Sequence, residues 1–343
     1  MLTLVRGGMG GSETYARELL ERLGDSDRVS AFSLVTEAAS GFSQAVPERV
    51  VRGLNGGASS LNRIATLAGA TLRSRSIRAQ LADADVVHYP FTVAVPAPPK
   101  SAGFVQTLFD VQHLDLPELF TGVELAFRRR YYEGVADRAD AVVTISEFAR
   151  EQIIHHLSID PERIVVAPLG VNAADFEPWA GERKPFVLYP ARGWAHKNHG
   201  RLIEAMALVR ETHPDFTLVL TGGALDGLGE FPEWVDRKGL VSLEELRELY
   251  RSAAVMAFPS LYEGFGLPPL EAMASGCPVA ASDSGSLPEV CGDAAVLFDA
   301  TSVESIAAGI LAAIDHGAEN YDAGLAQAAS FTWQRCADVH LDT

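Results

Sequence analysis

Several features are scarce or absent in this sequence of 343 residues, and each absence excludes a class of protein. No stretch approaches the run of about 20 apolar residues that a membrane-spanning helix needs. The opening MLTLVRGGMGG contains too short an apolar run for a secretory signal. The three cysteines, Cys277, Cys291 and Cys336, have spacings that suit neither a metal site nor a disulfide framework, which indicates a reducing cytoplasm.

Positive charge is also scarce, and its distribution is uneven. The formal net charge is −17; residues 1–175 carry 17 basic and 21 acidic side chains, and the remainder carries 11 and 24. A nucleic-acid-binding protein normally has a basic surplus, because contacts with phosphate supply most of its affinity. Nucleic acid is therefore not an expected partner. The change in charge balance near residue 175 indicates two differently built halves.

What the sequence does contain is an alternation of short apolar, β-branched runs with helical patterns such as 124–138 and 147–157. This alternation predicts an α/β protein with parallel sheets covered on both faces. A turn-rich stretch at 170–185 divides it into two doubly wound domains, 1–175 and 176–329, followed by residues 330–343. Ligands of such folds bind beyond the carboxyl ends of the strands, here in a cleft between the domains. The predicted strands are 84–90, 103–110, 140–146, 163–170, 185–191, 216–222, 253–260, 277–282 and 294–299.

A glycine-rich segment, RGGMGGSE at 6–13, precedes an amphipathic helix predicted over 12–23, with Ser12 as its N-cap. Glycines allow close backbone approach, and the amides at a helix N-terminus attract phosphate. The segment matches neither common phosphate-loop pattern, so a plain turn is an equally good interpretation. Only five residues precede Arg6, so the first strand is expected to be a stub, and a misassigned start codon is the plainest explanation.

The segment YEGFGLPPLEAMASGCPV, 262–279, carries two glutamates eight positions apart, Glu263 and Glu271. The glycines between them favour close backbone approach, and Pro268 and Pro269 suit the first turn of a helix, where we expect Glu271 to lie. A carboxylate aimed at an anion on this helix end would be repelled, so both glutamates should accept hydrogen bonds from neutral hydroxyls. A diphosphate between a sugar and a ribose, which is a nucleotide sugar, has this layout.

Positive charge for the diphosphate is expected from YPARGWAHKNH, 189–199, which places Arg192 and Lys197 after a strand. Arginine can bind phosphate oxygens bidentately, and lysine acts as a point charge. Each residue alone has a simpler interpretation: the arginine and lysine as solvated side chains, the first-turn glutamate as a complement to the helix dipole. The combined pattern favours the binding site.

The segment PSLYEGFGLPPLEAMASGCPVAASDSGSLPEVCGDAAVLFD, 259–299, resembles the donor-site signature of the GT-B-fold retaining glycosyltransferases of family 4. This family includes many bacterial mannosyl-, glucosyl- and N-acetylglucosaminyltransferases, with roles in polysaccharide biosynthesis. The segments GGMGGSETYARELL, VVTISEFAREQI, RIVVAPLGVNAADF and YPARGWAHKNH are also similar to family motifs and follow in the family's order. The resemblance implies two Rossmann-like domains that face a central cleft, the first on the acceptor side and the second binding the nucleotide sugar. It also implies that residues 330–343 begin a helix that crosses back to the first domain.

The resemblance also implies roles for individual residues. It places Glu263 on hydroxyls of the transferred sugar, Glu271 on the ribose, and Arg192 and Lys197 on the leaving diphosphate. The resemblance implies that no metal is needed, because arginine and lysine neutralise the leaving diphosphate. No cofactor is expected either, since a nucleoside diphosphate sugar, with GDP or UDP, is the co-substrate. The remaining donor-binding residues are expected to be the backbone at Gly10, Gly11, Gly264, Phe265, Gly266 and Leu267.

The chain departs from the family in its first half. The family's His-Asp pair is replaced by Phe109–Asp110, and His113 follows three residues later. His113 is a candidate for the catalytic role of the missing histidine, with a structural role as the open alternative. The run Asp83–Ala84–Asp85 has the spacing of a metal-binding motif found in another glycosyltransferase fold. It lies where a predicted helix ends and a predicted strand begins, which indicates a structural role at this boundary and no metal site.

The acceptor is expected to be a hydroxyl of a glycan, a lipid-linked molecule or a small metabolite. Basic residues in the first domain are compatible with peripheral contact at the inner face of the membrane, but the net negative charge of this domain favours the alternative, a solvated helix face. Two other functions stay open: a degenerate scaffold that binds donor without turnover, and a nucleotide-sugar epimerase on the same fold. The basic residues concerned are Arg63, Arg73, Arg75 and Arg78. The run Arg128 to Arg130 is interpreted as an exposed helix face.

Overall fold

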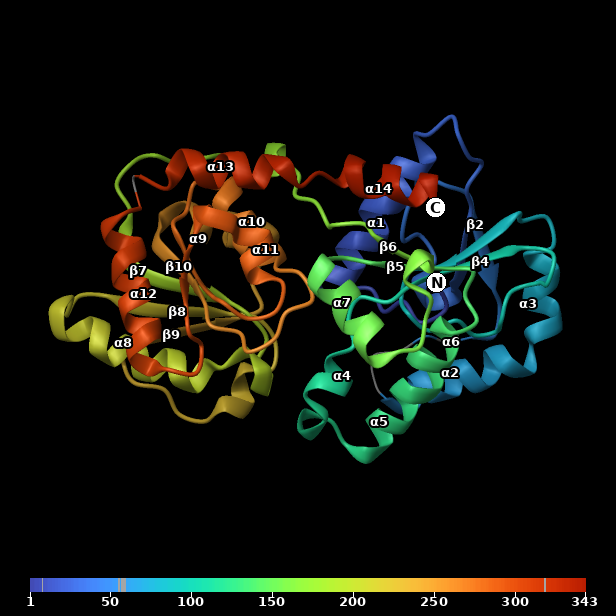
Figure 1. Cartoon of the computed structure of the whole chain (residues 1–343), viewed down its shortest axis with the longest axis horizontal. Helices are drawn as coiled ribbons and strands as arrows, with labels where there is room; N and C mark the ends of the chain where they lie inside the picture. Colours follow the sequence, from blue (N-terminus) through green and yellow to red (C-terminus); the bar gives the residue numbers. More distant parts are fainter. Residues whose placement is uncertain (8, 55, 57–59, 318) are drawn as a thin grey trace. The chain divides into compact units, whose positions relative to one another are not determined.

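A computed structural model describes residues 1–7, 9–54, 56, 60–317 and 319–343, with only the backbone of 60, 61, 63 and 64 (Figure 1). The chain forms two compact units. Unit 1 consists of Met1–Leu169 together with Trp333–Thr343, and unit 2 consists of Gly170–Thr332. The predicted domain limits of 175/176 and 329/330 lie within six residues of these divisions.

Unit 2 is built on one parallel sheet of six strands in the order β12-β11-β10-β7-β8-β9. Strands β10 and β11 are buried over almost their whole length, as the continuous apolar runs predict for a sheet with both faces covered. All five runs predicted in this half are strands. The strands are β7 Lys184–Pro190, β8 Thr217–Thr221, β9 Val235–Gly239, β10 Ala253–Phe258, β11 Val279–Ser282 and β12 Val296–Phe298.

Strand β9 was not predicted, because its sequence, VDRKG, contains no apolar run. It is one of the two edge strands of the sheet, and charged side chains on an edge strand hinder pairing with other molecules. The helices of unit 2 pack on both faces of the sheet, with α8 against α12 and α10 against α9, α11 and α13. They are α8 His199–Thr212, α9 Leu243–Ser252, α10 Leu267–Ala274, α11 Leu287–Cys291, α12 Val303–Asp315 and α13 Tyr321–Ser330.

Unit 1 contains two separate parallel sheets, one of four strands in the order β3-β4-β5-β6 and one of two strands, β1-β2. The four predicted runs form the larger sheet, whereas β1 and β2 were missed because their apolar runs are short. No strand forms in the described residues before α1, as expected from the short run preceding Arg6. The strands are β1 Ser33–Thr36, β2 Glu48–Val51, β3 Val86–Tyr89, β4 Gly103–Thr107, β5 Ala141–Thr144 and β6 Ile164–Val166.

The helices of unit 1 correct two predictions. The helix expected over 124–138 is interrupted by a π-helical turn, Arg129–Glu133, between α5 and α6. The first helix has Gly10, not Ser12, as its N-cap, because Gly10 adopts a positive φ of 59° that ends the preceding turn. The helices are α1 Gly11–Gly24, α2 Ser60–Leu72, α3 Ser74–Gln80, α4 Gln112–Asp115, α5 Gly122–Arg128, α6 Gly134–Ala136, α7 Glu147–His156 and α14 Trp333–Asp342.

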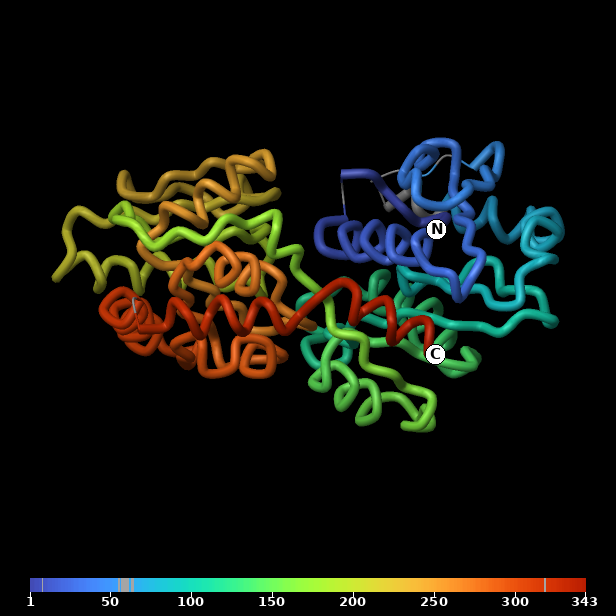
Figure 2. The backbone as a smooth tube through the Cα atoms, turned by 90° about the horizontal axis from the view of Figure 1, so that it is seen from above, coloured from blue at the N-terminus to red at the C-terminus, as the bar shows by residue number. Residues whose placement is uncertain are grey.

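The C-terminal helix α14 packs on α1, as the tube in Figure 2 shows. The Tyr15 hydroxyl is 2.7 Å from His340 Nε2 and 2.8 Å from Thr107 Oγ1. These two hydrogen bonds tie the C-terminal segment to both the first helix and the larger sheet of unit 1. The three cysteines are buried and form no disulfide.

Candidate donor-binding site

The order of strands in unit 2 defines where a ligand is expected. The chain runs from β7 outward through β8 to β9 and then returns to β10 on the other side of β7. The direction of winding therefore reverses between β7 and β10. In open parallel sheets, ligands bind outside the carboxyl ends of the strands at this switch point. The loops that follow β7 and β10 are those that contain Lys197 and Glu263.

The side chains of Lys197 and Glu263 meet directly at this switch point. Lys197 Nζ lies 2.5 Å from Glu263 Oε1, and each side chain is only 13% exposed. The ammonium also lies 5.3 Å from the centre of the Phe258 ring. A partly buried ion pair needs good geometry to offset its loss of hydration. The two residues that the sequence assigned to diphosphate and sugar are thus brought together from positions 66 residues apart.

A backbone hydrogen bond joins the two loops, and a tyrosine side chain from β7 supports the loop that contains Lys197. The Tyr189 hydroxyl donates to the Lys197 carbonyl over 2.6 Å, and the Leu261 amide donates to the His196 carbonyl over 2.8 Å. His196 is partly buried, and this burial, with the charge of Lys197, lowers its pKa to about 4. His196 is therefore neutral at pH 7.

A third loop, which follows β11, contacts the backbone of Glu263. Both the amide and the hydroxyl of Ser286 donate to the Glu263 carbonyl, over 3.1 and 3.0 Å. Gly285 has a φ of 63°, and a Cβ atom there would lie only 2.6 Å from the Glu263 carbonyl oxygen. Only glycine permits this approach. Sequence analysis missed both residues, although the turn-forming sequence SDSGS directly after a buried strand was a usable signal.

The structure corrects the predicted position of Glu271. Helix α10 begins at Leu267, so Glu271 is its fifth residue and lies beyond the first turn. Complementation of the helix dipole therefore does not explain it. The Tyr250 hydroxyl donates to Glu271 Oε2 over 2.9 Å, and burial raises the pKa of the carboxyl above its usual value. Tyr250, which is fully buried on α9, was not singled out from the sequence.

The glycine-containing loop between the two glutamates leads into α10. Gly266 is the N-cap, with a φ of 128° and no side-chain capping bond. Pro268 and Pro269 occupy the second and third helical positions and carry no amide hydrogen, so Leu267 is the one residue of the first three helical positions with an amide hydrogen. The Phe265 side chain is buried and packs edge-on against Phe331, with ring centres 5.7 Å apart. Phe265 and Gly264 can therefore contribute to a ligand through their backbone.

Arg192 lies directly after β7, as predicted. Its guanidinium carbon is 5.3 Å from the ring centre of Trp194, whose side chain is 49% exposed. The Gly193 amide donates to the Gly223 carbonyl over 3.0 Å, which joins this loop to the loop after β8. Arg192 and Lys197 thus stand on one connection, at the same end of the sheet.

The candidates in unit 1 have different surroundings. Gly10 and Gly11 form the turn and start of α1, and the nearby Gly7 amide donates to Glu13 Oε1 over 3.0 Å. His113 is 1% exposed, its Nε2 lies 3.2 Å from Glu133 Oε1, and burial lowers its pKa. It packs edge-on against Tyr132. This geometry favours the structural role of His113, and its catalytic role stays a prediction without support from its position.

The run Asp83–Ala84–Asp85, which has the spacing of a metal-binding motif, contributes an ion pair within unit 1. Both carboxylate oxygens of Asp83 lie 2.7 Å from the guanidinium of Arg49. This bidentate hydrogen bonding lowers the pKa of Asp83 to about 2. The aspartate is thus engaged in an ion pair, in agreement with its interpretation as a structural residue.

Comparisons with known proteins bear on this geometry. The family model described as Glycosyl transferases group 1 matches residues 172–329, and the model described as Glycosyltransferase Family 4 matches residues 9–175. The chain is 32% identical over 261 residues to the O-antigen chain mannosyltransferase B of Escherichia coli, covering 68% of this chain and 67% of that protein. The chain belongs to the group 1 glycosyl transferases.

Other relatives of this glycosyltransferase include a MMP alpha-(1->4)-mannosyltransferase from Mycolicibacterium hassiacum, 34% identical over 48% of this chain and 43% of that protein. Among solved structures, sucrose-phosphate synthase from Thermosynechococcus elongatus has a TM-score of 0.75 at 19% identity, covering 96% of this chain and 91% of the other. HepE from Anabaena, in complex with UDP-glucose, has a TM-score of 0.74 at 18% identity, covering 99% and 97%. The fold is GT-B, as predicted.

Proposed function

We propose that this glycosyltransferase moves a hexose-type sugar from a nucleoside diphosphate sugar to a hydroxyl acceptor, with retention of anomeric configuration and without a metal ion. The observation that carries the proposal is the contact between Lys197 and Glu263 at the switch point of the unit 2 sheet. These residues supply one cationic and one anionic group at the place where the fold accommodates a ligand. The diphosphate of a donor can bind to the cationic Lys197, and the hydroxyls of its sugar can donate hydrogen bonds to the anionic Glu263.

In this proposal the ion pair is replaced when donor binds. The Lys197 ammonium turns to the diphosphate, with Arg192 as a second cation, and the Glu263 carboxylate accepts hydrogen bonds from the sugar. Glu271 accepts from the ribose hydroxyls, and its Tyr250 partner fixes the orientation of the carboxylate. The backbone of Gly264 to Leu267 lines the donor.

The proposed reaction balances without an additional reagent. The acceptor oxygen forms a bond to the anomeric carbon while the bond from that carbon to the diphosphate oxygen breaks. The acceptor proton passes to an oxygen of the departing diphosphate, and attack on the face that this group leaves retains the configuration. Lys197 and Arg192 stabilise the negative charge that develops on the leaving group, which is the largest contribution expected from such a site.

The comparisons favour a glycan as the acceptor. Relatives named O-antigen chain mannosyltransferases act on a polysaccharide by their names, and HepE was crystallised with UDP-glucose. We therefore propose a mannosyl or glucosyl donor carried by GDP or UDP. Polysaccharide assembly at the cytoplasmic face of the membrane is the corresponding place of action.

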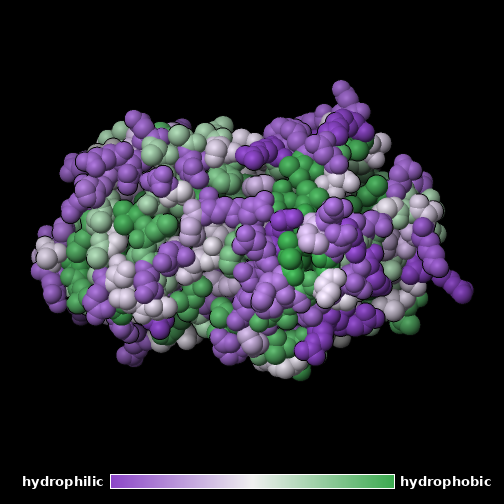
Figure 3. Space-filling view, viewed as in Figure 1, coloured by the Kyte–Doolittle hydropathy of each residue, from purple (hydrophilic) through white to green (hydrophobic). Residues whose placement is uncertain are grey.

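Peripheral membrane contact is part of this proposal. No helix among the described residues is long and apolar enough to cross a bilayer. On the face shown in Figure 3, hydrophilic side chains predominate and hydrophobic ones form separate patches. Leu72, at the end of α2, is 87% exposed and directly precedes exposed Arg73 and Arg75, a combination suited to anionic lipid. The side chain of Arg63 lies outside the described residues.

Isothermal titration against GDP, UDP and their hexose sugars, followed by product analysis with and without an oligosaccharide acceptor, tests the proposal. We expect one nucleotide sugar to bind, and its sugar to be transferred only when acceptor is present. Binding without turnover would identify a scaffold instead, and conversion of the donor without acceptor would identify an epimerase. Either outcome would refute the proposed transfer.

A further inference from the structure

The acceptor of the proposed reaction must lie beside the leaving diphosphate. In that reaction the acceptor oxygen attacks on the face that the diphosphate leaves, and its proton passes to a diphosphate oxygen. The acceptor hydroxyl is therefore within hydrogen-bond distance of the diphosphate when it reacts. Because Arg192 and Lys197 are the proposed cations for the diphosphate, the acceptor is expected next to the connection after β7 that carries both of them.

The nucleoside of the donor is expected on a different side of this site. Glu271, the proposed partner of the ribose, lies on α10 and is hydrogen bonded to Tyr250 of α9. These two helices pack against each other, whereas the connection after β7 leads into α8, which packs on α12. The surface beside Arg192 is thus not needed for the ribose.

One aromatic side chain is open on the connection after β7. Trp194 lies between Arg192 and Lys197 in the sequence, and its side chain is 49% exposed. The guanidinium carbon of Arg192 is 5.3 Å from the centre of the indole, and the ring centre of His196 is 5.7 Å away. A single exposed tryptophan is not unusual by itself, so its position between the two proposed cations is what distinguishes it.

The backbone holds Trp194 in a fixed position. Its amide donates to the Arg192 carbonyl over 2.7 Å, and its carbonyl accepts from the Lys197 amide over 2.9 Å. Gly193 packs so closely against the backbone of Ala224 that a Cβ atom could not be accommodated there. A rigid aromatic surface of this kind loses little conformational freedom on binding, which favours affinity.

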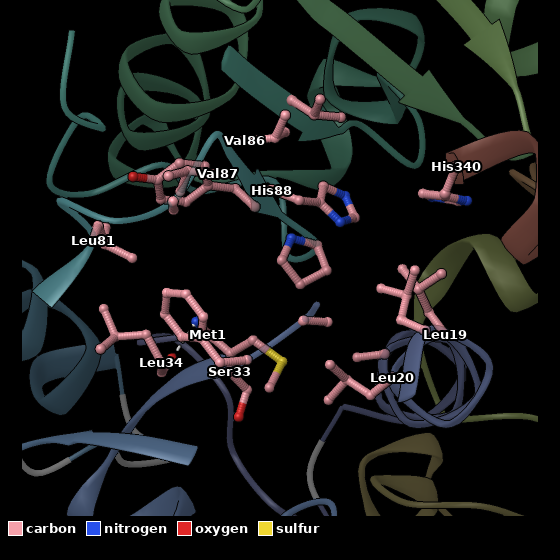
Figure 4. Close-up of a pocket in the computed structure, with 18 of the residues that line it drawn as sticks. Met1, Leu19, Leu20, Ser33, Leu34, Leu81, Val86, Val87, His88 and His340 are labelled. Atoms are coloured by element: carbon pink, nitrogen blue, oxygen red, sulfur yellow. Dashed lines mark hydrogen bonds between the residues drawn. The ribbon is translucent and has the colours of Figure 1, made fainter. Parts of the chain in front are cut away.

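The cavity of about 520 Å³ in unit 1 does not suit a sugar in the same way. Its lining is predominantly apolar, with Leu19 and Leu34 among the side chains around the open space in Figure 4. The side chain of His88 is already engaged, with its Nε2 atom 2.7 Å from Thr107 Oγ1. Because the hydroxyls of a buried sugar need partners, this cavity is not assigned to the acceptor.

We propose that Trp194 is the platform on which a hexopyranose ring of the acceptor glycan stacks. The C–H groups on one face of a pyranose are polarised by the neighbouring oxygens and are attracted to the electron-rich face of an indole. The hydroxyls stay at the rim of the ring, which leaves one of them available for attack. This assignment rests on the proposed function and specifies its acceptor as a pyranose ring.

Replacement of Trp194 by alanine tests this role in the transfer reaction. With an α-linked mannose or glucose trisaccharide as acceptor, we expect the acceptor KM to rise at least tenfold and kcat to stay within about threefold of the parent. Stacking contributes equally before and during the reaction, so its loss affects KM alone. Trp194→Phe keeps an aromatic face and should restore most of the affinity.

Trp179→Ala is the matched control for the loss of an exposed tryptophan. The side chain of Trp179 is 40% exposed, and the guanidinium carbon of Arg251 is 5.6 Å from the centre of its ring. Trp179 precedes β7 and therefore lies towards the amino ends of the strands, away from the proposed site. Its replacement should leave the acceptor KM unchanged, and an equal rise in both alanine variants would refute the assignment.

Tryptophan fluorescence provides a measurement that needs no turnover. With GDP or UDP present and absent, one of the two trisaccharides should shift the emission of the parent to shorter wavelength, because the sugar covers an exposed indole. Trp194→Phe should abolish this shift. No shift with either trisaccharide, or a shift that persists in the Trp194 variant, would overturn the proposal.

The outcomes also separate this proposal from the proposed function. Transfer by the parent with an unchanged acceptor KM in Trp194→Ala would refute the platform and leave the transfer reaction standing. If nucleotide affinity falls at least tenfold in this variant while the acceptor KM is unchanged, Trp194 stacks on the nucleobase and the proposal is wrong. Absence of transfer would refute the proposed function, and the fluorescence titration would still decide whether a sugar stacks on Trp194.

Discussion

At the scale of single residues, the contact of Lys197 with Glu263 determines how the site is interpreted. Two side chains of opposite charge, each 13% exposed, are placed 2.5 Å apart on loops that follow neighbouring strands. Such a pair contributes little to stability on balance, since lost hydration offsets the attraction. A role in binding charged and hydroxyl groups of a donor explains its position better than stabilisation does.

Replacing Lys197 by alanine should reduce kcat about 100- to 1,000-fold, because one stabilising group at the leaving diphosphate is lost. Lys184→Ala is the matched control, since Lys184 lies exposed on β7 of the same sheet and should retain full activity. Steady-state kinetics of both variants provide the measurement. Full transfer activity in the Lys197 variant would remove this residue from the mechanism.

Glu271 should give donor binding a dependence on acidic pH. Its pKa lies above the usual value because the carboxyl is buried, so protonation as pH falls removes an acceptor for the ribose at a higher pH than for an exposed glutamate. The donor KM should therefore rise as pH is lowered. Tyr250→Phe removes a hydrogen bond that stabilises the carboxylate, and should move this rise to still higher pH. A KM that is independent of pH in both proteins would contradict the ribose role.

At the scale of elements, the site depends on how closely three loops approach one another. The loop after β11 contacts the backbone of Glu263 through Gly285 and Ser286. A displacement of this loop would move the carboxylate that we propose binds the sugar, and small displacements of catalytic groups are costly.

Gly285→Ala should therefore reduce both stability and activity. Its φ of 63° costs about 1–2 kcal/mol for alanine, and the collision with Glu263 adds about 1–3 kcal/mol. Gly239→Ala is the control, because Gly239 has a φ of 70° with no atom near an added Cβ and should incur only the first cost. Thermal unfolding and kinetics of the two variants distinguish collision from backbone strain. Equal behaviour would show that the close approach is unimportant.

Two histidines at the start of α8, one in the turn before the helix and one at its first position, should make stability depend on pH. Burial, with nearby positive charge, lowers the pKa of both His196 and His199 from 6.5 to about 4. The unfolded chain then binds more protons than the folded chain between these values, so stability falls as pH drops from 6.5 towards 4. Each histidine contributes up to about 1.4 kcal/mol per pH unit.

His199→Phe should flatten this dependence in denaturant titrations at a series of pH values. The exposed His155, replaced by glutamine, serves as the control for the removal of a histidine side chain as such. An unaltered slope in the His199 variant would show that its burial is not the cause.

Some helices and strands could be predicted from the sequence and others could not. Strands with continuous apolar runs, such as β10 and β11, were predicted because both faces of the sheet are covered. The charged edge strand β9 could not be found from apolar periodicity. The position of Glu271 was misjudged because the start of α10 at Leu267 depends on the φ of Gly266, which the sequence does not reveal.

At the scale of the whole molecule, the sequence predicted the fold more completely than the site. Alternating elements and the resemblance gave two Rossmann-like domains, which the strand orders and the similar structures confirm. Lys197 and Glu263 were selected individually, but the contact between them required the sheet order. Tyr250 could not be selected from the sequence, because its role depends on packing between α9 and α10.

The central claim is that the switch point of the unit 2 sheet binds a nucleoside diphosphate sugar through Lys197 and Glu263. Isothermal titration of the parent chain, Lys197→Ala and Glu263→Gln with the same panel of nucleotide sugars tests it most directly. The account predicts saturable binding of one nucleotide sugar to the parent. It also predicts at least tenfold weaker binding to Lys197→Ala, and loss in Glu263→Gln of the preference for the sugar over the bare diphosphate. Equal affinities in all three proteins, or no binding to the parent, would contradict it.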